Sequence, residues 1–142
     1  MWTRGTPAAQ AAQTPATPQT PPATPPTPSK SAAKDSRCFE MRTYYAAPGK
    51  ADALNARFRE HTSRLFQKHG MTIVGYWIPQ EKPDVIVYIL AYKDRAARDA
   101  AWKAFGSDPE WQTARKASEA EGRLAEKVES VFMDATDYSP LK

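Results

Sequence analysis

The stretch "DVIVYILAYK", residues 84–93, decides the fold because it is apolar on both sides of a predicted strand. Successive side chains of a strand point to opposite faces of the sheet. Both alternate sets are apolar here, with Val85, Val87, Ile89 and Ala91 on one face and Ile86, Tyr88, Leu90 and Tyr92 on the other. Helices on one side of a sheet cover only one face, so the second face needs another cover. A second copy of the domain, packed sheet against sheet, would supply it, and we therefore expect a homodimer.

The segments before this strand show the same mixture of strand and helix patterns. Residues 38–46, "CFEMRTYYA", alternate and run into the turn residues "APG". Residues 50–69 have apolar side chains at helical spacing, and Gly70 is typical of the residue that ends a helix. Residues 71–79, "MTIVGYWIP", are rich in β-branched and aromatic types and are joined to the next strand by "QEKP", which predicts a hairpin.

Two helices and a last strand follow. Asp94 can cap a helix over residues 95–105, and Asp108 followed by proline is a strong start for a helix over residues 109–121. A final strand is predicted in "KVESVFMDA", residues 127–135. The order is strand, helix, strand, strand, helix pair, strand. This βαββαβ order predicts an α+β, ferredoxin-like fold with a four-stranded antiparallel sheet and helices on one face.

The first 37 residues differ in composition from the rest of the chain. They hold eight of the 13 prolines and are otherwise mostly Thr, Ala and Gln. Such a segment buries little and lacks backbone donors, so we expect residues 1–37 to be a disordered Pro-rich tail or linker and residues 38–142 to form one domain. The tail has four basic residues and one acidic residue, a balance of +3 in a total of +4. The remainder therefore carries only +1, which argues against a nucleic-acid-binding domain.

Metal and cofactor sites are not expected. The single cysteine, Cys38, rules out an intrachain disulfide and a cysteine-based zinc site. His61 and His69 are separated by eight helical residues, about 12 Å, which is too far to share one ion. The sequence therefore predicts no metal and no cofactor, with a heme held by one axial histidine as the remaining alternative.

The chain has no apolar window long enough to span a membrane, and its N-terminus lacks the charged and apolar layout of a signal peptide. We expect a cytoplasmic protein without a membrane span. The alternative is an exported protein, if the true start lies upstream and encodes a signal peptide.

The candidate ligand pocket is predicted between the first helix and the sheet. Glu40, Arg42 and Tyr44 alternate along residues 38–46 and therefore share one face of a strand. His61 falls on the apolar stripe of the first helix, from which its imidazole could meet that face. The pocket candidates are Arg42, Tyr44, His61, Tyr76 and Trp77. The competing interpretation is structural, with the histidines bonded at the edge of the core and Glu40 in a cross-strand salt bridge.

Three blocks of the sequence resemble the NIPSNAP family: "FEMRTYYAAPGKADALNARFREHTSRLFQKHGMTIVGYWIP", "AARDAAWKAFGSDPEWQ" and "KVESVFMDATDYSP". The resemblance implies a dimeric α+β barrel, in agreement with the strand that is apolar on both sides. It implies less about activity, because small bacterial members generally have none assigned. Animal members are linked to mitochondria and to recruiting the mitophagy machinery. The wider barrel group includes cofactor-free monooxygenases and heme-handling enzymes.

These observations favour a homodimeric module that binds a small apolar or aromatic ligand or a protein partner. The alternative is a cofactor-independent oxygenase- or isomerase-like small enzyme that uses the same pocket. A third, weaker hypothesis is that "PPATPPTP", residues 21–28, binds SH3-like grooves. The residue types do not assemble a nucleophile, a base and an orienting group, so binding leads over catalysis.

Overall fold

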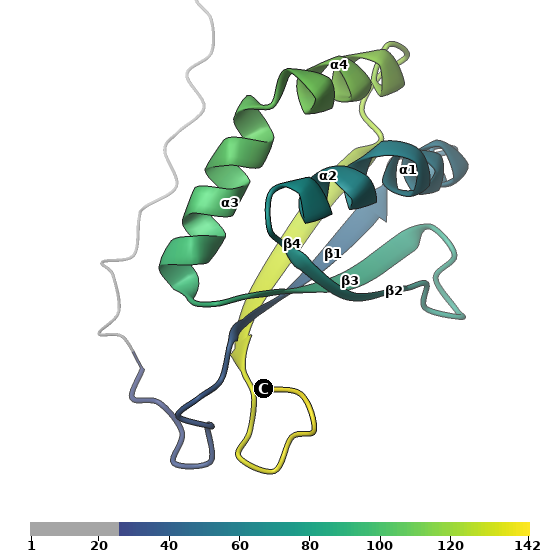
Figure 1. Ribbon diagram of the computed structural model, residues 1–142. Helices are drawn as coiled ribbons and strands as arrows, with labels where there is room; N and C mark the ends of the chain where they lie inside the picture. Colours follow the sequence, from purple (N-terminus) through teal and green to yellow (C-terminus); the bar gives the residue numbers. More distant parts are fainter. Residues whose placement is uncertain (1–25) are drawn as a thin grey trace, which may run out of the picture.

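The computed structural model describes residues 26–142, in which a sheet is covered by helices on one face (Figure 1). Along the chain the elements are β1 (Cys38–Ala46), α1 (Ala51–Arg57), η1 (Phe58–Thr62), α2 (Ser63–Lys68), β2 (Thr72–Trp77), β3 (Val85–Tyr92), α3 (Arg95–Ser107), α4 (Pro109–Ser118) and β4 (Ala125–Asp134). The strands form one antiparallel sheet in the order β2-β3-β1-β4. The predicted α+β, ferredoxin-like arrangement is therefore confirmed.

The first helix differs from the single regular helix expected over residues 50–69, because η1 is a turn of π-helix between α1 and α2. The backbone N–H of Ser63 donates to the carbonyl of Phe58, five residues back, and the Ser63 hydroxyl donates to the same oxygen at 2.8 Å. The wider turn advances the buried stripe by one position. Thr62 is consequently buried, whereas His61, which the regular spacing placed on the stripe, is only half-buried.

The helix starts lie where the capping residues predict them. The Asp94 side chain accepts a hydrogen bond from the backbone N–H of Ala97, and Asp108 accepts one from Glu110, each at 2.8 Å. Proline at the first position of α4 fits a helix start, because its missing N–H would have no partner there. The helix ends and the last strand are shifted by a few residues from their expected bounds, as is usual for boundaries read from sequence.

The core lies between the helices and the sheet face that carries Glu40, Arg42 and Tyr44. The β1–β3 register sets these three residues opposite Leu90, Tyr88 and Ile86, respectively, all of which are buried. The same core includes Leu54, Leu65 and Phe66 from the first helix and Phe105 from α3. The predicted shared face of Glu40, Arg42 and Tyr44 is thus present, and it looks toward the helices.

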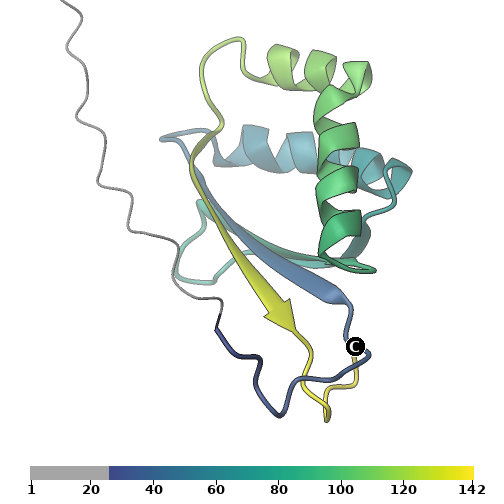
Figure 2. The same ribbon diagram turned by 90° about the vertical axis from the view of Figure 1, so that its left-hand side faces the viewer.

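The second face of the sheet, here called the open face, has no covering helix within the described chain (Figure 2). At its centre Val87 and Ile89 of β3 are only half-buried. Toward the two edges Trp77 is 50% exposed and Val131 is 48% exposed. One apolar face of β3, the strand that is apolar on both sides, is therefore not covered by any helix of the described chain.

The ends of the described chain lie together at one end of the sheet (Figure 1). The Ala33 backbone N–H donates to the Ala135 carbonyl at 2.8 Å, and the Asp137 backbone N–H donates to the Ser31 carbonyl at 2.8 Å. The expected boundary at residue 38 thus falls within a segment that is hydrogen-bonded to the C-terminal residues. Residues 1–25 of the expected tail lie outside the described residues. From residue 26 onward, no helix combines the length and apolar character that crossing a membrane requires.

Candidate functional site

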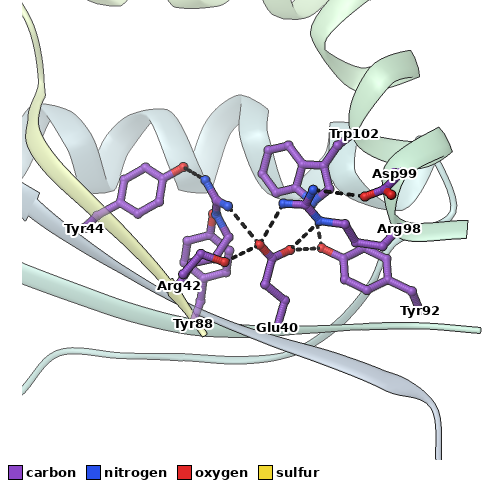
Figure 3. A network of polar contacts seen from close by, with 9 residues as sticks. Glu40, Arg42, Tyr44, Tyr88, Tyr92, Arg98, Asp99 and Trp102 are labelled. Atoms are coloured by element: carbon purple, nitrogen blue, oxygen red, sulfur yellow. Dashed lines mark hydrogen bonds and ion pairs between the residues drawn. The ribbon is translucent and has the colours of Figure 1, made fainter. Parts of the chain in front are cut away.

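The buried carboxylate of Glu40 is the centre of a polar network under α3 (Figure 3). Its side chain is 0% exposed. Oε1 accepts hydrogen bonds from the Tyr92 hydroxyl at 2.7 Å and from Arg98 Nε at 3.1 Å. Oε2 accepts from Arg98 Nη2 at 2.8 Å, Arg42 Nη1 at 3.0 Å and the Ser130 hydroxyl at 2.5 Å. Every contact comes from a donor, so the network is built for an ionised carboxylate.

The protonation of Glu40 follows from this arrangement. Burial alone would raise the pKa of the carboxyl group, but the hydrogen bonds, led by those from Arg98, lower it to about 2. Burial and the hydrogen bond to the carboxylate raise the pKa of the Tyr92 hydroxyl, which stays protonated and donating. Glu40 does form ion pairs, but they are not the cross-strand pair predicted at a sheet edge: the partners are Arg42 on the same central strand and Arg98 on α3.

Arg42 is held on all sides by this network. Its Nε donates to the Tyr88 hydroxyl at 2.9 Å, and its Nη2 donates to the Tyr44 hydroxyl at 3.4 Å. The guanidinium lies over the Trp102 ring at 4.4 Å from the ring centroid. Trp102 Nε1 in turn donates to the Tyr92 hydroxyl at 2.7 Å. The Glu40 carboxylate thus positions Arg42 and Tyr92. Arg42 in turn positions Tyr44, and Tyr92 positions Trp102, and both of these aromatic side chains face a cavity.

That cavity, of about 520 Å³, lies between the helices and the β1–β4 side of the sheet. Its volume is within the range of small-molecule sites, about 300–1,000 Å³. Six aromatic side chains line it: Tyr44, Phe58, Phe66, Trp102, Phe105 and Trp111. Several of them pack on one another, with the Phe105 and Trp111 ring centroids 4.6 Å apart. The walls are therefore suited to a flat apolar or aromatic group.

Two buried polar atoms at this cavity have no hydrogen-bond partner within the described chain, Nε of Arg57 and Oγ1 of Thr62. Arg57 also contacts the end of α4. Its Nη1 donates to the hydroxyl of Ser118, the last residue of α4, at 3.2 Å and to Glu119, the next residue, at 3.1 Å. Sequence reasoning missed both residues. Thr62 reaches the cavity only because of the π turn, and the sequence pattern did not indicate that turn.

The predicted pocket residues are only partly brought together. Tyr44 lines the cavity, and Arg42 contacts two lining residues without being one itself. Tyr76 lies on the same sheet face, but its hydroxyl is 2.8 Å from Ser63 Oγ and its ring packs on Phe58.

The other two candidates lie elsewhere. Trp77 is on the open face, on the far side of the sheet from the cavity, because it neighbours Val87 in the register. His61 is half-buried and is not among the residues lining the cavity. The sequence-based pocket therefore mixed residues from both sides of the sheet.

His69 has a structural environment. Its Nε2 lies 2.7 Å from Oδ2 of Asp108, the residue that caps α4, and Lys68 donates to the same oxygen at 2.8 Å. The hydrogen bond from Lys68 and then that from His69 hold the pKa of the Asp108 carboxyl well below its usual range. These contacts join the end of α2 to the start of α4, as expected of a histidine at the edge of the core.

Comparison with solved structures gives the same fold. A NIPSNAP family protein with unknown function from Agrobacterium tumefaciens is 23% identical, with 78% of this chain and 98% of that chain covered and a TM-score of 0.69. An uncharacterized NIPSNAP domain protein from Burkholderia xenovorans is 24% identical, with coverage of 72% and 98% and a TM-score of 0.63. A putative antibiotic biosynthesis monooxygenase from Nitrosomonas europaea is 16% identical, with coverage of 69% and 97% and a TM-score of 0.52.

Sequence comparison with family models identifies the family. No curated protein is significantly similar in sequence to this chain. The NIPSNAP family model, however, matches residues 39–140, which is the whole sheet-and-helix domain apart from its first strand residue. The resemblance seen in the sequence blocks is confirmed, and the chain belongs to the NIPSNAP family.

Proposed function

We propose that this protein is a homodimeric small-ligand-binding module that holds an apolar or aromatic ligand in the cavity between its helices and its sheet. The observation that carries the proposal is the cavity itself, about 520 Å³ with six aromatic side chains in its wall. A wall of packed aromatic rings with a few polar groups is the usual construction of a small-molecule site. The Glu40 network supports this function by fixing Trp102 and Tyr44 in the wall.

The homodimer is the second part of the proposal. Val87 and Ile89 occupy the centre of the open face, and the register places Trp77 beside Val87. An apolar surface on one side of a sheet is usually buried against another apolar surface. A second copy, sheet against sheet, would bury these side chains and leave the cavities of both protomers on the outer, helical sides.

The alternative is a cofactor-independent oxygenase- or isomerase-like enzyme that uses the same cavity. Proton transfer needs a base within hydrogen-bond reach of the reacting atom. Neither His61 nor His69 lines the cavity. Of the two carboxylates in the lining, that of Glu119 is engaged by Arg57 and Arg115, at 3.1 and 3.4 Å, and that of Glu126 belongs to an exposed residue. These contacts favour binding over catalysis.

Native mass spectrometry of the full chain, purified from cells without added ligand, tests this function. We expect a dimer with a reproducible small-molecule mass on each subunit. Gly106 lines the cavity, and a Cβ atom added there would have no heavy atom within 4 Å. Gly106→Trp should therefore cause no clash at Cβ, and its indole ring should reduce the room for a ligand.

The matched control is Gly106→Ala, which also raises the helix propensity at this position but does not fill the cavity. The adduct should disappear from Gly106→Trp and persist in Gly106→Ala. A clean dimer without adduct in the wild type would point instead to a protein partner, and a monomer would contradict the proposed assembly.

A further inference from the structure

Two residues that line the cavity each carry a buried polar atom without a hydrogen-bond partner in the described chain. The Thr62 side chain is buried, with the residue 3% exposed, and Arg57 is 7% exposed. Within the described chain, neither Thr62 Oγ1 nor Arg57 Nε has a hydrogen-bond partner. Buried polar atoms are nearly always paired in folded proteins, because leaving one without a partner costs free energy. Both residues line the same cavity, and because the two atoms are themselves covered, one bound group could supply the missing partner to both after a small shift of the side chains over them.

The chemistry of the two atoms defines what that group is. The Nε–H of arginine can only donate a hydrogen bond, and a threonine hydroxyl can donate as well. Arg57 is the last residue of α1 and Thr62 is the last of η1, and the π turn brings both to the cavity side of the helix. An acceptor with two oxygens, such as a carboxylate, satisfies both donors at once.

The charge of the cavity favours the same class of ligand. Its lining carries four basic residues and two acidic ones, Arg57, Arg115, Arg123 and Lys127 against Glu119 and Glu126. Glu119 forms ion pairs with Arg57 and Arg115, and Lys127 is paired with Glu129 outside the lining, whereas Arg123 forms no ion pair with any described residue. Positive charge is therefore in excess around the cavity, and the potential attracts an anion.

The position of Arg57 connects the charged group to the aromatic wall. Its guanidinium carbon lies 5.3 Å from the centroid of the Trp111 ring, and Trp111 packs on Phe105. We infer that the ligand is an aromatic carboxylate, with its carboxylate at Arg57 and Thr62 and its ring between the aromatic side chains. This inference rests on the proposed function and names the class of ligand for that same cavity.

Equilibrium dialysis of the full chain with 2-naphthoate and with 2-methylnaphthalene tests the inference, because the two probes have the same ring and differ in the charged group. We expect naphthoate to bind at least tenfold more tightly. Thr62→Val keeps the shape of the side chain and removes the hydroxyl. It should weaken naphthoate binding about tenfold and leave 2-methylnaphthalene binding unchanged. The control is Thr43→Val, an equivalent change on the open face, which should alter neither affinity.

A stability measurement separates ligand binding from folding. Because Thr62 Oγ1 has no partner in the described chain, Thr62→Val should unfold at the same temperature as the wild type or at a higher one. A lower unfolding temperature would show that the hydroxyl has an internal partner and would overturn the inference. Equal affinity for the two probes would also overturn it, while leaving the cavity as a ligand site. Failure of both probes to bind would contradict the proposed function as well.

Discussion

The Glu40 carboxylate on β1 accepts two hydrogen bonds from the Arg98 guanidinium on α3, at 3.1 and 2.8 Å. The two residues are 58 positions apart, so this pair ties α3 to the central strand β1 of the sheet. Trp102, one helical turn beyond Arg98, lines the cavity and donates to Tyr92, which itself donates to Glu40. The buried carboxylate therefore determines where one wall of the cavity stands.

Removing the charge of Glu40 should destabilise the fold strongly. Glu40→Gln leaves two guanidinium groups without their carboxylate in the core, and breaking a buried ion pair typically costs about 3–5 kcal/mol. The free energy of unfolding, measured with urea, should fall by that amount. The matched control is Glu129→Gln on exposed β4, which breaks a surface pair with Lys127 and should change stability little. Equal effects of the two substitutions would contradict the role given to Glu40.

The same carboxylate predicts an acid-sensitive stability. Its pKa is lowered in the folded protein from 4.5 to about 2, so the unfolded chain takes up the proton more readily. The resulting stabilisation, about 3 kcal/mol, is complete above pH 4.5 and is lost as the pH falls toward 2. Urea unfolding at a series of pH values should show this loss in the wild type. Glu40→Gln should lack this part of the pH dependence, and parallel curves for the two proteins would contradict the assignment.

The π turn predicts an energetic coupling between helix and sheet. Ser63 Oγ donates to the Phe58 carbonyl and lies 2.8 Å from the Tyr76 hydroxyl on β2. Ser63→Ala and Tyr76→Phe should each lower the free energy of unfolding by about 1 kcal/mol. The double variant should cost less than the sum, because each single change breaks the same hydrogen bond and that bond can be lost only once. Strict additivity in this double-mutant cycle would show that the two hydroxyl groups do not interact.

The open face predicts how the proposed dimer would respond to a charge placed in its interface. Val87 lies between Thr43 and Trp77 in the register, at the centre of that face. Val87→Asp should convert the proposed dimer into a monomer in sedimentation velocity, because an unpaired carboxylate is costly in an apolar interface. Circular dichroism checks that the variant still folds. Tyr138→Asp, at a residue 81% exposed, serves as the control and should remain dimeric. A folded Val87→Asp protein that stays dimeric would place the interface elsewhere.

Local patterns in the sequence were sufficient to predict the sheet and which residues share each of its faces. Alternation placed Glu40, Arg42 and Tyr44 on one side of β1, and the capping side chains of Asp94 and Asp108 located the starts of α3 and α4. These features depend on the nearest few residues, so they can be read without knowledge of the tertiary structure.

The candidate site was harder to predict because it depends on how the layers meet. The π turn moved Thr62 rather than His61 to the buried side, and a regular helical period gives no sign of such a turn. Arg98 and Trp102 join the network only once α3 has crossed the sheet. Trp77 follows Tyr76 directly in the sequence, yet the pleat of β2 sends it to the opposite face.

The central claim, that an aromatic ligand occupies the cavity beside Trp102 and Trp111, is tested most directly by the indole N–H signals of the full chain in ¹⁵N-labelled NMR spectra. Titration with 2-naphthoate should shift the signals of Trp102 and Trp111, which line the cavity, with assignments made from Trp→Phe variants. The Trp77 signal is an internal control because that ring lies on the open face. Shifts confined to Trp77, or no shift at saturating naphthoate, would contradict the account.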